Sequence, residues 1–207
     1  MKRTRWLYLL VFMAWLPAAP AAHANYVLQP KPADLSDLPH EEYFTWGIDF
    51  TLPANEEITC ATLTFTDIWD WTTEQNDHLF IHLLDNIAAG VKSYVDNQGG
   101  GDNFAGKGAL VSSWSDPVGG HQRDFNLVFD FGALGILDNL KADIATTPRT
   151  GRANFGFGLD PDCHYFNSGV TFTITTEPVI HINPVPEPAT MCLLGLGALG
   201  LLRKRRA

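Results

Sequence analysis

The 207-residue chain has few cysteines and few basic residues, and it lacks the common hydrolase motifs. Its three cysteines are too few for a small domain that is held together by several disulfides. Gly-x-Ser-x-Gly and His-Glu-x-x-His, which mark α/β-hydrolases and zinc metalloproteases, do not occur in the sequence. We therefore expect a protein that is not an enzyme.

Basic residues are especially scarce between Asn25 and Pro188, where there are seven of them against 23 acidic residues. The net charge of this part is therefore near −16, compared with −9 for the whole chain. Such a charge would repel the phosphates of nucleic acids, which excludes nucleic acid as a partner. It would attract cations, calcium above all, although the same acidity also keeps an exported protein soluble.

The first 24 residues have the three parts of a secretory signal peptide. Basic residues at the start are followed by an apolar run over residues 6–16 and then by Ala22-His23-Ala24. Signal peptidases cleave after a triplet with small residues at its first and third positions, as in Ala22-His23-Ala24. We therefore expect cleavage to leave Asn25 at the new N-terminus.

The last 23 residues, 185–207, form a second segment of three parts. A proline-rich motif is followed by fourteen uncharged, mostly apolar residues, 189–202, and then by a basic cluster. The apolar run is shorter than the roughly 20 residues of a relaxed membrane-spanning helix, and the basic cluster favours the cytoplasmic side. The motif is Val185, Pro186, Glu187 and Pro188, and the cluster is Arg203, Lys204, Arg205 and Arg206.

This tail closely resembles the PEP-CTERM sorting signal of Gram-negative bacteria. The resemblance implies that an exosortase, a membrane processing enzyme, recognises the tail and cleaves near the motif. It also implies an inner-membrane intermediate and then a cell-surface or extracellular location, often in species that build a biofilm matrix from extracellular polysaccharide. An ordinary C-terminal membrane anchor is the alternative.

The remaining residues suffice for one domain. We expect an extended lead-in over 25–42, a folded domain over 43–177 and a linker over 178–184. Alternating apolar and polar residues predict eight strands, and apolar residues spaced by three and four predict one helix at 134–144. The strands are 43–52, 58–66, 78–84, 91–95, 109–114, 124–131, 154–159 and 170–175. This pattern indicates an all-β fold, a jelly-roll-like β-sandwich with one short helix, and the body loosely resembles the secreted sandwich domains that often precede such tails.

Cys60 and Cys163 are the two cysteines of the body, whereas Cys192 lies in the tail. Because exported proteins fold in an oxidising compartment, we expect these two to form a disulfide. Two buried free thiols that act as small apolar residues are the alternative.

Two polar clusters at strand ends are candidate calcium loops, since calcium takes six to eight oxygen ligands. Asx-turns that terminate the strands are the alternative explanation, and neither spacing matches an EF-hand loop. The candidate ligands are Asp67, Asp70 and Asp77 in the first loop and Asp160, Asp162 and Asn167 in the second.

Trp69, Trp71 and Trp114 are candidates for a surface on which sugar rings stack. Aromatic faces beside acidic side chains suit sugars, which have apolar C–H faces and many hydroxyls. Core packing is the stronger alternative in a domain so rich in phenylalanine.

Catalytic and zinc signals are weaker. Asp70 and Glu74 could act as a carboxylate pair in glycoside hydrolysis, but any acidic exported protein offers such pairs. His78 and His82 would share a face of a strand, yet two histidines are an incomplete zinc site.

The leading hypothesis is a non-enzymatic protein of the cell surface or biofilm matrix that is sorted through its tail. The alternative is a carbohydrate-binding module, assisted by calcium, that retains extracellular polysaccharide. A secreted hydrolase is the third possibility.

Overall fold

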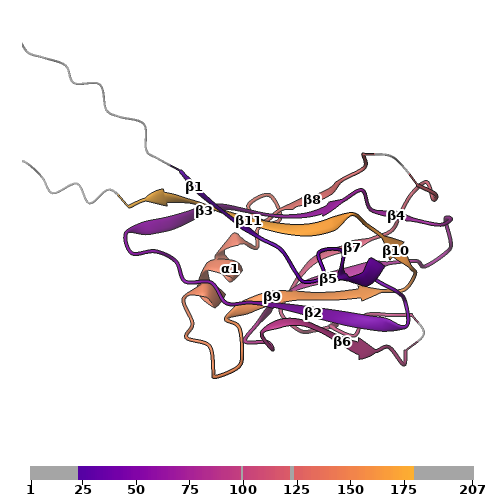
Figure 1. The fold of residues 1–207 in the computed structure, drawn as a ribbon, viewed down its shortest axis with the longest axis horizontal. Helices are drawn as coiled ribbons and strands as arrows, with labels where there is room; N and C mark the ends of the chain where they lie inside the picture. The colour runs from indigo at the N-terminus through magenta and orange to yellow at the C-terminus, as the bar shows by residue number, and fades with distance from the viewer. Residues whose placement is uncertain (1–22, 99, 122–123, 180–207) are drawn as a thin grey trace, which may run out of the picture.

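The computed structural model describes residues 23–98, 100–121 and 124–179 (Figure 1). The predicted sorting tail, residues 1–22 of the predicted signal peptide and residues 180–184 of the predicted linker lie outside the described residues. No helix among the described residues is long and apolar enough to cross a membrane.

Two antiparallel sheets make up the fold. The four-stranded sheet has the order β1-β11-β3-β8, and the five-stranded sheet has the order β6-β2-β9-β5-β7. The first contains β1 (Ala24–Leu28), β11 (Gly169–Pro178), β3 (Glu56–Thr66) and β8 (Leu127–Asp130). The second contains β6 (Gly90–Val95), β2 (Glu42–Ile48), β9 (Phe155–Pro161), β5 (Leu79–Asp85) and β7 (Ala109–Trp114).

The two sheets lie one above the other, and the hydrophobic core fills the space between them (Figure 1). Strand β3 shows how the sequence produces this arrangement. Ala61, Leu63 and Phe65 are fully buried, whereas Thr62 and Thr64 between them are partly exposed on the opposite face of the sheet. Because successive side chains of a strand point to opposite faces, this alternation assigns one face to the core and the other to solvent.

A two-stranded ribbon and two short helices complete the described structure. The ribbon pairs β4 (Trp69–Asp70) with β10 (Tyr165–Phe166), and it lies at the end of the sandwich away from α1 (Figure 1). The helices are η1 (Leu35–Asp37) and α1 (Leu137–Ile144), and α1 contacts β3 and β9.

Within the described residues, the prediction of an all-β fold with one short α-helix is confirmed, and each of the eight predicted strands overlaps an observed one. The helix begins at Leu137 instead of residue 134 because Gly135 has a φ of +71°, which is incompatible with a right-handed helix. Strand β2 ends at Ile48 because, two residues later, the Asn154 side chain replaces a neighbouring strand as the hydrogen-bond partner of the backbone. The side-chain oxygen of Asn154 accepts a hydrogen bond from the N–H of Phe50 at 3.1 Å, and the side-chain nitrogen donates one to the C=O of Phe50 at 2.8 Å.

Three strands were not predicted. Strand β1 begins at Ala24, the last residue of the predicted signal peptide, and otherwise falls in the expected lead-in, where it forms the edge of its sheet by pairing with β11. Strands β4 and β10 have two residues each, so neither is long enough to carry a periodic pattern. Their pairing joins residues almost a hundred positions apart, which local sequence does not reveal.

Candidate functional site at the end formed by β4 and β10

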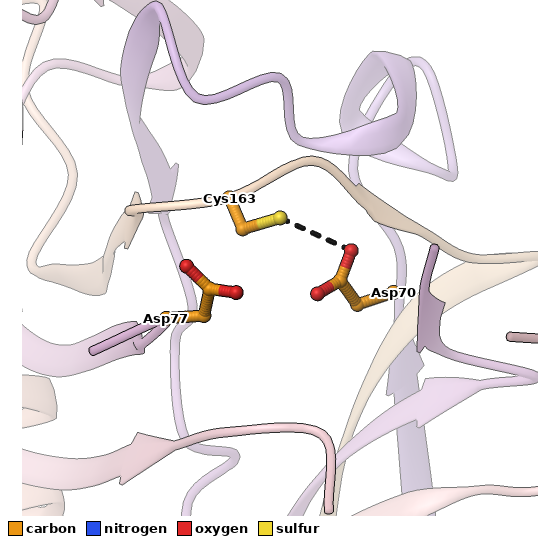
Figure 2. Close-up of side chains that lie close together, drawn as sticks. All are labelled: Asp70, Asp77 and Cys163. Carbon is orange, nitrogen blue, oxygen red and sulfur yellow. Dashed lines mark hydrogen bonds between the residues drawn. The ribbon is translucent and has the colours of Figure 1, made fainter. Parts of the chain in front are cut away.

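Two carboxylates and a thiol meet beside the ribbon. Asp70 belongs to β4, Asp77 lies in the turn before β5, and Cys163 lies between β9 and β10. Their ligand atoms all lie within 4.8 Å of one another. Figure 2 shows both carboxylates directed into the same space beside the thiol, which donates a hydrogen bond of 3.0 Å to Asp70 Oδ1. We call these three residues the acid–thiol cluster.

The neighbouring loop holds Asp70 in place. The backbone N–H of Asp70 donates to Asp116 Oδ2 at 3.0 Å, and Asp116 Oδ1 accepts bonds from the N–H groups of Val118 and Gly119. The side chain of Asp70 also accepts a bond from the N–H of Trp71. Since Asp70 is only 1% exposed, its carboxylate occupies a preorganised position inside the protein.

Burial dominates the electrostatics of the cluster. It raises the pKa of the Cys163 thiol to about 12, with a further contribution from the Asp70 carboxylate, so the thiol is protonated near neutral pH and acts as a donor. Burial also raises the pKa of Asp77, and the charges of Glu74 and Asp70 raise it further. Tyr165 is fully buried, and its pKa is raised first by burial and then by the charges of Cys163, Asp70 and Asp77.

Several buried polar atoms in this region have no hydrogen-bond partner. Among the described residues there are five such side-chain atoms, and four of them lie within residues 69–78 and 162–168, which we call the β4–β10 end. The four are Asp77 Oδ2, His164 Nε2, the Tyr165 hydroxyl and Asn167 Oδ1. Because buried polar groups in native proteins are nearly always paired, this concentration marks the region as a candidate site.

The predicted calcium ligands do not converge. Of the six, only Asp70 and Asp77 share a cluster in the part of the chain that is described. Asp160 accepts hydrogen bonds from the backbone and side chain of Asn103, and Asp162 accepts one from the N–H of Gly101, so both anchor the loop between β6 and β7. Calcium binding itself stays a prediction.

The other two predicted ligands are engaged elsewhere. Asp67 follows β3, and its carboxylate pairs with His121 at 3.1 Å. The hydrogen bond from His121 lowers the pKa of Asp67 below its usual value. Asn167 donates from its side chain to the carbonyl of Asp34 at 2.9 Å, which ties β10 to the segment before η1.

The predicted disulfide is wrong, because Cys60 and Cys163 are both free. Cys60 lies within β3, opposite Thr175, with its sulfur 3.9 Å from Asp130 Oδ2. It is six residues from Thr66, where β3 ends, and thus about 20 Å along the strand from the start of the connection to β4. A disulfide needs Cα atoms about 5.5 Å apart, so two thiols placed along different parts of the sandwich cannot pair.

Aromatic rings stack along the outside of the ribbon. Trp69 stacks on Phe166 at a centroid distance of 4.4 Å, and Phe166 stacks on His164 at 4.3 Å. His121 packs against Trp69 at 5.2 Å, and Trp71 contacts the edge of Phe166 while remaining 70% exposed. We call these five residues the aromatic surface.

The third predicted tryptophan is not part of this surface. Trp114 is partly buried against the core, where it packs on Tyr165 at 5.4 Å and stacks on Phe125 at 6.1 Å. Sequence reasoning missed His121, which packs on Trp69, and also Phe166 and His164. The only signal for Phe166 and His164 was that they lie beside the acidic turn at 160–162, since the pairing that brings them to Trp69 is long-range.

The remaining candidates have separate roles. The two ring nitrogens of His82 lie 2.9 Å from Asp102 Oδ2 and from the Lys107 carbonyl, so His82 fixes the loop before β7. His78 Nδ1 lies within 3.1 Å of the hydroxyls of Ser113 and Ser115. The two histidines therefore have different partners and do not form a shared metal site in the described residues.

Two hollows lie elsewhere on the described surface. One, of about 570 Å³, opens beside α1 and is lined by Phe50, Leu52 and Ile58 among others. The other, of about 520 Å³, is lined by residues of the five-stranded sheet and of the loops beside it, with Tyr43, Tyr94 and Phe104 among its walls.

Comparison with known proteins identifies the tail. A family model described as the PEP-CTERM protein-sorting motif matches residues 184–206. The chain carries a PEP-CTERM tail. The predicted recognition is thereby confirmed, and the motif implies an exported protein that an exosortase sorts through the membrane to the cell surface. A search of curated proteins and a search of solved structures each returned no significant match.

The PEP-CTERM tail lies outside the described residues, and it accounts for transport only. What the protein does after export has to be argued from the folded body, where the acid–thiol cluster and the aromatic surface share one end of the sandwich.

Proposed function

We propose that the exported protein is a non-enzymatic component of the cell surface or biofilm matrix that binds extracellular polysaccharide through its aromatic surface. The order of its strands supports a jelly-roll-like sandwich as the scaffold, because the chain repeatedly crosses between the two sheets.

The exposure of Trp71 on the stacked ribbon carries this proposal. A tryptophan that is 70% exposed leaves a large apolar ring in water, although burying it would stabilise the protein. The apolar C–H face of a sugar can cover such a ring, while the ring of His121 and nearby carboxylates can bond the sugar hydroxyls.

The ring is also presented on a rigid support. The stacking of Trp69, Phe166 and His164 fixes the ribbon from one side, and the buried Asp70 fixes the backbone of Trp71 from the other. A surface that is already ordered loses little conformational entropy on binding, which favours affinity for a long, repetitive chain.

The burial of Asp70 favours a binding role over hydrolysis. In a glycosidase, the acid and its partner carboxylate must reach the glycosidic bond of the substrate. Asp70 is 1% exposed and faces Asp77 and Cys163, so it is poorly placed to donate a proton to a bound sugar chain.

Retention of the full-length protein on exopolysaccharide from its host tests the proposal. Because one aromatic stacking contact contributes about 1 kcal/mol, Trp71→Ala should weaken binding about fivefold. The same change should alter the free energy of unfolding by less than about 0.5 kcal/mol, since the side chain is exposed.

Tyr94→Ala is the matched control. Tyr94 is an aromatic residue that is 40% exposed, and it lines the hollow of about 520 Å³ beside the five-stranded sheet. Its binding should equal that of the unmodified protein. Loss of binding in Tyr94→Ala but not in Trp71→Ala would show that polysaccharide binds in that hollow instead of on the aromatic surface. No retention of the unmodified protein would leave a structural role without polysaccharide binding.

A further inference from the structure

We propose that Asp70, Asp77 and Cys163 bind a divalent cation of the zinc class through two carboxylate oxygens and one thiolate sulfur. This site is independent of polysaccharide binding. It shares Asp70 and Asp77 with the first predicted calcium loop, but it adds the Cys163 thiol and selects a different metal.

The geometry suits one ion. Three segments far apart in the sequence place their ligand atoms within 4.8 Å of one another (Figure 2). Zinc lies about 2.0–2.3 Å from its oxygen and sulfur ligands, so atoms that share a tetrahedral zinc ion are roughly 3.5 Å apart. Side-chain movements of about 1 Å would bring the three atoms into that arrangement.

The unpartnered Tyr165 hydroxyl is a second and independent indication of a ligand. Tyr165 is fully buried, lies directly opposite Asp70 in the β4–β10 ribbon, and has a hydroxyl without a hydrogen-bond partner. Asp77 Oδ2 is also buried without a partner. A cation would satisfy the carboxylate, and a water in the fourth position of that cation could bond the hydroxyl.

The local charge points to a cation as well. Neither Asp70 nor Asp77 forms an ion pair with another residue of the described chain. Two carboxylates that face one another in a partly buried place repel each other, and that repulsion is relieved when a divalent ion binds between them.

The thiol decides which cation fits. Calcium requires six to eight oxygen ligands, whereas a thiolate together with carboxylates suits zinc. As the S–Zn bond forms, the S–H bond breaks and the proton passes to solvent, since the thiolate is the ligand. Because Asp70 is almost inaccessible, the ion would connect β4, the turn before β5 and the turn before β10 as a structural centre.

The test is metal binding by the metal-stripped full-length chain in detergent. All variants carry Cys192→Ser, so that the tail cysteine cannot contribute. Titration calorimetry should show one Zn²⁺ per chain, and Cys163→Ser should bind it at least tenfold more weakly. Cobalt(II) in place of zinc should give a thiolate-to-cobalt charge-transfer band that Cys163→Ser lacks.

Cys60→Ser is the matched control, because Cys60 is a second half-buried thiol beside an aspartate, Asp130. It should retain both the zinc affinity and the cobalt band. The proposal is overturned by the absence of zinc binding, by equal affinities in Cys163→Ser and Cys60→Ser, or by a preference for Ca²⁺. If Cys163→Ser does not fold, the cobalt spectrum of Cys60→Ser decides, since absence of the thiolate band also overturns the proposal.

Discussion

The core between the sheets and the interior of the β4–β10 end are built in different ways. In the core, Phe131, Phe155, Phe157 and Phe172 are fully buried and contact one another ring against ring. At the β4–β10 end, buried carboxylates, a thiol and a phenol lie together, and several of their polar atoms have no partner. The core is consistent with selection for stability alone, whereas the β4–β10 end has the unsatisfied polar groups typical of a binding site.

Removing a core ring should have the largest effect. Phe157 contacts Trp46 and three other phenylalanines, so Phe157→Ala leaves a cavity where surrounding rings cannot fully collapse. We expect a loss of about 3–5 kcal/mol in the free energy of unfolding, measured by urea denaturation. Phe166→Ala, in the half-buried ring of the aromatic surface, should cost clearly less. Equal losses would mean that the two regions contribute alike to stability.

A buried acid should make stability depend on pH. Burial raises the pKa of Asp160 to about 6 from its ordinary value of 3.8. Since the folded pKa is the higher one, its contribution to stability is fully present below about pH 4 and is lost as the pH rises through about 6. In the unmodified protein, ionisation of Asp160 should lower the free energy of unfolding by about 3 kcal/mol over this pH range. The Asp160→Asn variant should not show this decrease, because Asn cannot ionise.

Urea denaturation at several pH values between 4 and 7 measures this effect as the difference between the two proteins. The amide oxygen of the variant can still accept the bond from the Asn103 N–H. Asp138→Asn is the control, because the Asp138 side chain is 97% exposed and should leave the pH dependence unchanged. Parallel curves for Asp160→Asn and the unmodified protein would contradict the prediction.

Two tyrosines offer the finest comparison. The Tyr165 hydroxyl is buried without a partner, whereas the Tyr26 hydroxyl donates to Glu56 at 3.0 Å. In the presence of chelator, Tyr165→Phe should raise the free energy of unfolding by about 1 kcal/mol, because it removes an unsatisfied group. Tyr26→Phe should lower it by a similar amount. A loss of stability in both variants would show that the Tyr165 hydroxyl has a partner in solution.

The sequence predicted the strands best where burial alone determines the pattern. In β3 and β11, apolar and threonine residues alternate over many positions, because one face of each strand lies against the core. The boundaries were less predictable, since they depend on single residues such as Gly135 before α1 and Asn154 beside Phe50.

The candidate site was predictable only in part. Asp70, Asp77, Trp69 and Trp71 stood out as acidic and aromatic residues near a strand end. Their sorting into a buried cluster and an exposed surface could not be foreseen, because it depends on the pairing of β4 with β10. The error about the disulfide has the same origin. Composition and compartment favoured a bond between the two cysteines, but the register of β3 places Cys60 far along the sandwich from Cys163.

The sequence by itself determined the destination of this protein and the class of its fold. A sorting tail is recognised as a linear segment, and strand periodicity is a local property, so both can be seen without a structure. Only the tertiary structure decided which polar residues meet. Asp70, Asp77 and Cys163 come from three separate segments, and their proximity results from sheet register and turns, which depend on contacts distant in the sequence.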